Sequence, residues 1–116
     1  GASVVVITSG ANRQGYAGGP IYGAAKAAAR ALVRSLSEAL VKRGVRVNAV
    51  SPGLIDTALN TRILSGEFRD ALIRRIPMRR VGTPEEVAKA VVFLASDDSS
   101  FVTGANIAAD GGLAQV

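Results

Sequence analysis

Hydrophobic residues fall into short runs that predict strands. The first run, from Ser3 to Ser9, reads Ser-Val-Val-Val-Ile-Thr-Ser and is rich in β-branched residues. Such runs are typical of strands that a parallel sheet buries on both faces. The second, from Val45 to Val50, alternates apolar with polar residues and is broken by Ser51-Pro52-Gly53. A third short strand is expected between Val102 and Ala108.

Between the first two strands the apolar spacing changes to that of a helix. From Ile21 to Arg43, apolar residues recur every three or four positions, which favours a long amphipathic helix. Gly44 is expected to end this helix, because glycine readily adopts the left-handed conformation of a C′ residue. Two short helices are expected around Asp56–Leu64 and Glu67–Ile76, after the second strand.

A further helix start is visible in Thr83-Pro84-Glu85-Glu86. Thr83 is the expected N-cap, Pro84 suits the first helical position, and Glu86 can complete a capping box. We expect this helix to continue to Ala95, just before the third strand.

The order of these elements predicts an α/β fold: a parallel sheet of about three strands with flanking helices. The crossover between the first two strands is expected to be right-handed. Because the chain shows no internal repeat and no linker, residues 1–116 are expected to form a single partial domain. A sheet of about three strands has an exposed edge. The pattern of the first strand is typical of a strand with neighbours on both sides, so we expect the open edge to lie beside it.

Composition narrows the chemistry. The chain has 116 residues, 48% of them hydrophobic and 20% charged, which is ordinary for a globular domain. It contains no Cys and no His, so disulfides, thiolate metal sites and histidine acid/base chemistry are excluded, and we expect no metal. Any proton transfer must fall to Tyr, Lys, Asp or Glu. No apolar run approaches the roughly 18–20 residues of a membrane span and no signal-type segment is seen, so we expect a cytoplasmic protein.

The net charge of +5 raises nucleic acid as a possible partner. The basic residues are scattered along the chain, however, and aromatic residues make up only 4%. This pattern favours a solvated basic surface over a nucleic-acid interface. The nucleic-acid alternative predicts salt-sensitive DNA binding, of which we expect little.

Candidate catalytic residues converge on the carboxyl edge of the predicted sheet, where open α/β folds bind ligands. Ser9 ends the first strand, and Pro52-Gly53 ends the second. Tyr22 and Lys26 lie in the first turns of the long helix, four residues apart and therefore on one helix face.

These residue types suit proton transfer coupled to hydride transfer. An isolated phenol, with a pKa of about 10, is a poor base at neutral pH, but a nearby ammonium such as Lys26 favours the phenolate. The Ser9 hydroxyl can hydrogen-bond a carbonyl oxygen on which charge develops. No side chain supplies a hydride, so a cofactor is required.

The ordered motifs resemble those of the short-chain dehydrogenase/reductase family. Tyr22-Gly23-Ala24-Ala25-Lys26 matches its Tyr-x-x-x-Lys motif, and Ser9 precedes Tyr22 by thirteen residues, as the family's catalytic serine does. The likeness continues through the whole chain, in Arg46 to Gly53, Ile55-Asp56-Thr57, Val102 to Asn106, and Asp110-Gly111-Gly112.

The resemblance implies an NAD- or NADP-dependent oxidoreductase that interconverts a secondary alcohol and a ketone. Tyr22 would be the general acid/base, Lys26 would also bind the nicotinamide ribose, and Ser9 would orient the substrate carbonyl. Pro52, Gly53, Ile55 and Thr57 would line the nicotinamide end of the cofactor. Residues 57–80 would cover the substrate, and the loop from Gly10 to Ile21, with Asn12, Arg13, Gln14 and Tyr16, would form the other wall. The long helix would pack on its copy in a homo-oligomer.

The family's glycine-rich phosphate-binding turn is missing from this sequence. The chain therefore resembles the C-terminal half of the family's Rossmann-like doubly wound sheet, and its partner would be the missing N-terminal half or another subunit. An alternative is a non-catalytic fragment that acts as a complementation partner or a self-associating scaffold. Saturable cofactor binding to this chain alone would argue against that alternative.

Overall fold

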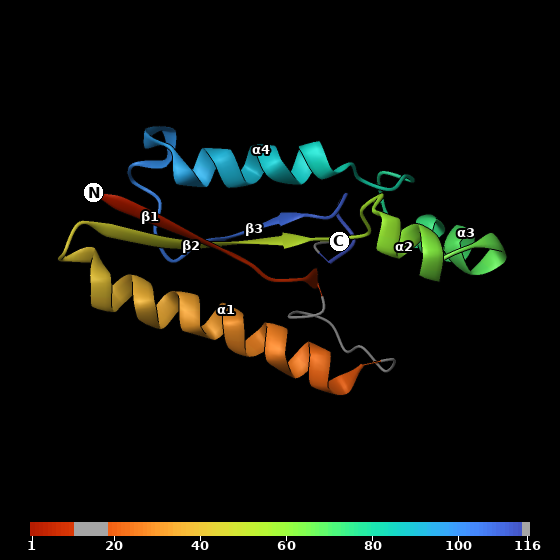
Figure 1. Cartoon of the computed structure of the whole chain (residues 1–116), viewed down its shortest axis with the longest axis horizontal. Coiled ribbons are helices and arrows are strands. Elements are labelled where there is room, and N and C mark those ends of the chain that lie inside the picture. Colours follow the sequence, from red (N-terminus) through yellow and green to blue (C-terminus); the bar gives the residue numbers. More distant parts are fainter. Residues whose placement is uncertain (11–18, 115–116) are drawn as a thin grey trace.

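The computed structural model describes residues 1–10 and 19–114, and its described strands form one parallel sheet. The strands stand in the order β1-β2-β3, with β2 in the centre. One long helix covers each face of the sheet, and two short helices lie beyond one end of it (Figure 1). The strands are β1 (Ala2–Ile7), β2 (Val45–Pro52) and β3 (Asn106–Ala109), and the helices are α1 (Pro20–Val41), α2 (Ala58–Ile63), α3 (Gly66–Arg75) and α4 (Pro84–Ala95).

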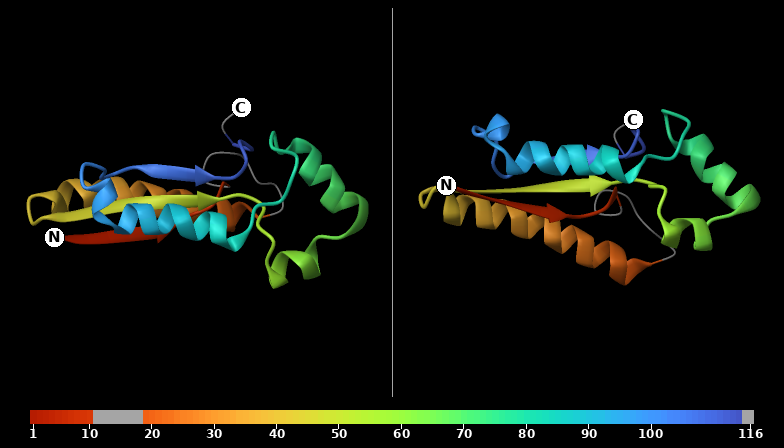
Figure 2. Two further views of the ribbon diagram at one scale, coloured as in Figure 1. Left: turned by 90° about the horizontal axis from the view of Figure 1, so that it is seen from above. Right: turned by 45° about the horizontal axis from the view of Figure 1, so that its top comes forward.

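The predicted parallel α/β architecture is confirmed. Pairing runs from Ala2 opposite Val45 to Ile7 opposite Val50, and β3 continues from β2 at Ala49 opposite Asn106. Helices α1 and α4 lie on opposite faces of this sheet, as the views in Figure 2 also show. The central strand needs a covering layer on each face, because Val47, Asn48, Ala49 and Val50 of β2 alternate between the faces and are all completely buried.

The core lies on both sides of β2. On one face Val33 of α1 packs with Val47 and Ala49, and all three side chains are at most 1% exposed. On the other face Leu94 of α4 is completely buried. The predicted long helix is confirmed, but it ends at Val41 with Lys42 as its C-cap, so Gly44 is not its C′ residue. Gly44 does adopt the left-handed conformation, with φ of +74°, in the turn that leads to β2.

The second strand is longer than predicted. Pro52 was expected to break β2, but it pairs with Ala109 as the last residue of the strand. A proline fits at this position because the ladder continues through the next residue, where the Gly53 amide donates to the Ala109 carbonyl at 3.0 Å. Strand β2 therefore ends at Pro52, beyond the predicted end at Val50.

Strand β1 is not buried on both faces along its whole length, so that part of the sequence prediction is wrong. The side chains of Val4 and Ile7 are 42% and 46% exposed, and they point to opposite faces of the sheet. In the described part of the chain, β1 has a neighbouring strand on one side alone. Its outer edge is the open edge that the pattern predicted.

The guanidinium of Arg46 ties β2 to the end of α4. Its Nη1 donates to the carbonyls of Leu94 and Val102 and to the Ser99 hydroxyl at 2.9–3.2 Å, and its Nη2 donates to the Ser96 carbonyl at 2.9 Å. A helix leaves its last carbonyls without helical partners, and these carry partial negative charge. Arg46 therefore caps α4 from the neighbouring strand.

The predicted start of α4 is confirmed in detail. The Thr83 hydroxyl accepts from the Glu86 amide, and the Glu86 carboxylate accepts from the Thr83 amide at 2.9 Å, which completes the capping box. Across the described residues, none of the helices is long and apolar enough to cross a membrane.

Candidate functional site

Tyr22 and Lys26 share one face at the start of α1. The Lys26 ammonium lies 5.7 Å from the centroid of the Tyr22 ring, which confirms the geometry expected for residues four apart on a helix. Tyr22 is 48% exposed, so a ligand can reach its side chain. This helix begins directly after Gly19 with Pro20 in the first turn, where a fixed φ favours helix initiation.

Lys26 also reaches across to the sheet. Its Nζ donates to the carbonyl of Ile7, the last residue of β1, at 3.4 Å. Ser9 follows two residues later, partly buried and just beyond the end of the strand. The structure thus brings Lys26 to the segment that carries Ser9, whereas the roles of Ser9, Tyr22 and Lys26 stay predictions. Asn12, Arg13, Gln14 and Tyr16, predicted to form the other wall, lie outside the described residues.

The Pro52-Gly53 turn is crowded by the end of β3. A Cβ built on Gly53 would stand 2.7 Å from the Cα of Asp110, far closer than real Cβ contacts. The family resemblance implied that Gly53 lines the nicotinamide end of the cofactor, and this role stays a prediction. In the structure the close neighbour of Gly53 is the protein's own backbone, and this contact by itself requires glycine.

Ile55 and Thr57 belong to a loop that its own hydrogen bonds hold in shape. The Asn60 side chain donates to the Ile55 carbonyl at 2.7 Å, and the Asn60 amide donates to the Thr57 hydroxyl at 3.2 Å. Thr57 is accordingly the N-cap of α2. Ile55 is only 8% exposed and forms a parallel bridge with Gly82. The segment predicted to line the nicotinamide is therefore a preformed loop.

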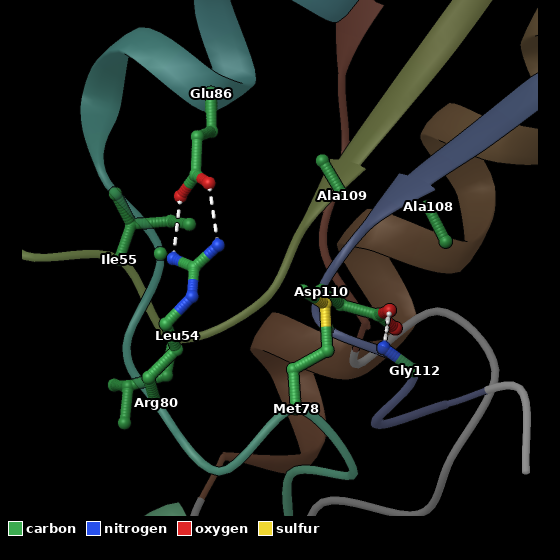
Figure 3. Close-up of a pocket in the computed structure, with 11 residues that line it drawn as sticks. Leu54, Ile55, Met78, Arg80, Glu86, Ala108, Ala109, Asp110 and Gly112 are labelled. Carbon is green, nitrogen blue, oxygen red and sulfur yellow. Dashed lines mark hydrogen bonds and ion pairs between the residues drawn. The ribbon is translucent and has the colours of Figure 1, made fainter.

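A pocket of about 360 Å³ lies beside this loop, between the last turn of the chain and the start of α4 (Figure 3). Of the predicted site residues, it includes Ile55 and neither Tyr22 nor Lys26, so it is not the predicted catalytic site. Its lining is mainly apolar or backbone: Leu54, Ile55, Met78, Arg80, Gly82, Glu86, Ala108, Ala109, Asp110, Gly111 and Gly112.

The two opposite charges of this pocket neutralise each other. Arg80 and Glu86 form a two-pronged ion pair, with Nη2 to Oε1 at 2.6 Å and Nη1 to Oε2 at 2.8 Å (Figure 3). The hydrogen bond from Arg80, followed by that from the Thr83 amide, lowers the pKa of Glu86 to about 2. The pair therefore stays ionised at neutral pH. The pocket's third charged residue, Asp110, accepts hydrogen bonds from the amides of Gly112 and Ala114.

Among residues 1–10 and 19–114, no group of three or more His, Asp or Glu side chains could hold a metal ion. The predicted catalytic residues at the carboxyl edge offer a hydroxyl, a phenol and an ammonium group.

The sequence reasoning missed a polar cluster under this edge. The side chains of Thr8, Ser51 and Asn106 hydrogen-bond one another, although each comes from a different strand or its end. The signal was present in the sequence: a polar residue directly follows or closes the apolar part of the first two strands. It could not be assigned without the register of β3, which places Asn106 beside them.

Comparison with known proteins identifies the relatives of this chain. The family described as enoyl-(acyl carrier protein) reductase matches residues 1–114. A 3-oxoacyl-[acyl-carrier-protein] reductase of Thermotoga maritima is 43% identical over 111 residues, which are 96% of this chain and 45% of that protein. An acetoacetyl-CoA reductase of Allochromatium vinosum is 39% identical over 110 residues, 95% of this chain and 44% of that protein. The chain thus spans a little under half the length of these relatives.

Solved structures agree with the sequence comparison. A crystal structure assigned as a β-ketoacyl-ACP reductase has a TM-score of 0.86 and 45% identity, covering 98% of this chain and 47% of that one. One assigned as a 2-deoxy-D-gluconate 3-dehydrogenase of Agrobacterium tumefaciens, with bound NADP, has a TM-score of 0.92 and 37% identity, covering 96% and 46%. The match extends over the sheet, both covering helices and the loop at the carboxyl edge, and the chain therefore belongs to the short-chain dehydrogenase/reductase family.

Proposed function

We propose that this chain is the catalytic half of an NAD(P)-dependent oxidoreductase that interconverts a secondary alcohol and a ketone. The observation that carries the proposal is the pair of Tyr22 and Lys26, with the ammonium 5.7 Å from the ring centroid and the phenol side chain about half exposed at the carboxyl edge. The position of this pair at the carboxyl edge of a parallel α/β sheet supports the proposal, because open sheets of this kind bind ligands at that edge.

In the reducing direction each residue has one task. The Tyr22 hydroxyl donates a proton to the substrate's carbonyl oxygen as that oxygen becomes an alkoxide. The Lys26 ammonium stabilises the phenolate that remains on Tyr22. The Ser9 hydroxyl donates a hydrogen bond to the same substrate oxygen and holds it for protonation.

The residues at the edge fit the nicotinamide end of a dinucleotide. Lys26 and Tyr22 offer donors suited to ribose hydroxyls, and the loop with Ile55 and Thr57 is already shaped by Asn60. Pro52 and Gly53 end β2 and directly precede this loop in the chain. When bound, NAD(P)H supplies the hydride that no side chain can supply. NADP is the first form to test, because it is bound in a similar structure.

For the substrate we propose a 3-oxoacyl thioester. Two of the relatives are named for reducing 3-oxoacyl groups on acyl carrier protein or acetoacetyl groups on coenzyme A. Their shared chemistry is a ketone two carbons from a thioester, which is an acceptor for the proton and hydride described above.

The proposal includes a partner for this chain, namely the N-terminal half of the fold. The chain matches only 44–45% of its relatives, and β1 exposes Val4 and Ile7 along an edge that could accept another strand. The same edge supports the alternative in which the chain is a non-catalytic complementation partner or scaffold. A homo-oligomer and a cytoplasmic location complete the proposal as predictions.

The experiment compares the chain alone with the chain joined behind the N-terminal half of the Thermotoga maritima reductase. NADPH binding is titrated for both, and NADPH oxidation is followed with acetoacetyl-CoA. We expect saturable NADPH binding and reduction of acetoacetyl-CoA in the joined protein, and neither of them in the separate chain. A joined protein that binds NADPH but never reduces the ketone would contradict the proposed reaction. Tight NADPH binding by the chain alone would contradict the requirement for a second half.

A further inference from the structure

We infer that Thr8, Ser51 and Asn106 form a positioning relay, which fixes Ser9 relative to the Pro52-Gly53 turn. The inference rests on the proposed function, because it assigns these residues a task in the reaction of Ser9. None of the three is proposed to touch substrate or cofactor. Thr8 and Ser51 act through the residues that follow them in the chain, and Asn106 acts by accepting from the Ser51 hydroxyl.

The relay is a continuous line of short hydrogen bonds across the sheet. The Thr8 and Ser51 hydroxyls are 2.5 Å apart, and the Ser51 hydroxyl donates to the Asn106 side-chain oxygen at 2.7 Å. The Thr8 hydroxyl also lies 3.3 Å from that oxygen. Since the three residues come from β3 and the ends of β1 and β2, side chains here join all the strands of the described sheet.

The relay is buried and lies on the face that α1 covers. Thr8 and Ser51 are 3% and 2% exposed. Ser51 shares its face of β2 with Val47 and Ala49, which form the apolar core with Val33 of α1. The relay therefore lies next to this apolar core, at the carboxyl end of the strands. In such surroundings hydrogen bonds are strong and their geometry is well defined.

Among the described residues, only the oxygen of the Asn106 side-chain amide is hydrogen-bonded. The Nδ2 atom of this amide is buried and, in the described part of the chain, has no hydrogen-bond partner. Buried polar atoms are normally paired, and one that is not requires an explanation. An apolar residue would avoid the unpaired nitrogen but would lose the oxygen that receives Ser51. The oxygen that accepts from the Ser51 hydroxyl is therefore what this amide contributes to the relay.

The relay fixes the positions of site residues because it holds the residues that directly precede them in the chain. Thr8 directly precedes Ser9, and Ser51 directly precedes Pro52-Gly53. Because the hydroxyls of Thr8 and Ser51 are held together, Ser9 directly follows a fixed residue, and so does the Pro52-Gly53 turn. A catalytic hydroxyl displaced by about 1 Å can lose about a hundredfold in rate, so this short link matters for Ser9.

The first test needs no activity. Backbone amide hydrogen exchange is measured for Thr8 and Gly53, which donate to Val50 and Ala109, and compared with Ala49 in the core. We expect Ser51→Ala to speed exchange at Thr8 and Gly53 at least about tenfold relative to Ala49, because the link between the strand ends is lost.

The matched control is Ser99→Ala. Ser99 is also fully buried and also uses its hydroxyl for hydrogen bonds, to Leu94 and Ser96, but it lies at the far end of α4. Any loss of global stability should appear in both variants. If Ser51→Ala and Ser99→Ala change the exchange of Thr8 and Gly53 relative to Ala49 by the same factor, the relay proposal is wrong.

The second test uses the protein joined to an N-terminal half. Thr8→Val keeps the shape of the side chain without its hydroxyl, whereas Thr8→Ser keeps the hydroxyl. We expect Thr8→Val to lower kcat at least about tenfold with KM within about twofold, and Thr8→Ser to restore kcat. Unchanged kcat in Thr8→Val would overturn the proposal. If the unmutated protein reduces no ketone, the proposed function fails, and the exchange measurement still decides whether the relay fixes the strand ends.

Discussion

The backbone of Gly53 lies against Asp110 so closely that a Cβ on Gly53 would stand 2.7 Å from both the Cα and the Cβ of Asp110. This contact joins the turn after β2 to the end of β3. The carboxylate of Asp110 in turn accepts from the Gly112 and Ala114 amides, at 2.9 and 3.0 Å. The edge of the sheet is thus closed by contacts between the backbones of two turns.

Replacing Gly53 should therefore destabilise the fold. We expect Gly53→Ala to lower the free energy of unfolding by about 1–3 kcal/mol, because the added methyl forces the two turns apart. The measurement is urea unfolding. Gly10→Ala is the control, since a Cβ there meets no atom of the described residues within 4 Å, and it should change stability by less than about 0.5 kcal/mol. Equal effects of the two substitutions would contradict this account of Gly53.

The cap that Arg46 places on α4 gives a second prediction. Arg46→Met removes the hydrogen bonds that the charged guanidinium donates to Leu94, Ser96, Ser99 and Val102, although the three carbonyls keep other donors. We expect a loss of about 2–3 kcal/mol in the free energy of unfolding. Arg46→Lys should recover little of it, because an ammonium lacks the planar fork of donors. Arg43→Met, at an exposed position in the same region, serves as the control and should be nearly neutral. A fully stable Arg46→Met protein would contradict the capping role.

Local sequence rules predicted most of the architecture. The period of the apolar residues gave the long helix, and the Thr83 capping box gave the start of α4, because both depend on neighbours within one turn. The length of β2 was not predictable in this way. Pro52 breaks a strand by local rules, but here it lies at a ladder end whose partner, Ala109, is far along the chain.

In the candidate site, too, features set by neighbours in the chain were predictable, and those set by distant residues were not. The geometry of Tyr22 and Lys26 follows from helix spacing and was predictable. The cluster of Thr8, Ser51 and Asn106 was not, since it depends on the register of three strands. The Arg80–Glu86 pair was missed for a different reason: Glu86 was fully accounted for as a capping residue, and the approach of Arg80 depends on the path of the loop before α4.

The Arg80–Glu86 pair makes stability depend on pH in the acid range. Because the pKa of Glu86 is lowered from 4.5 to about 2 in the folded protein, its contribution is present above about pH 4.5 and is lost as the pH falls toward 2. We expect Tm to fall more steeply over this range in the unmutated protein than in Glu86→Gln. Both Tm curves should run parallel above about pH 6.

Glu85→Gln is the control for this prediction, because Glu85 lies on the same first turn of α4 but outside the ion pair. Its Tm curve should keep the acid slope of the unmutated protein. Because both partners are on the surface, raising the salt concentration should weaken the effect of Glu86→Gln. A Glu86→Gln protein with an unchanged acid slope would show that the pair does not contribute.

The central claim is that the Tyr22 hydroxyl transfers the proton in ketone reduction. The most direct measurement is kcat for NADPH-dependent reduction of acetoacetyl-CoA by the joined protein with Tyr22→Phe, which removes only that hydroxyl. General acid catalysis is worth about 10²–10⁴-fold, so we expect kcat to fall at least about a hundredfold while NADPH binding is retained. A Tyr22→Phe protein that binds NADPH and reduces the ketone at the unmutated rate would contradict the claim.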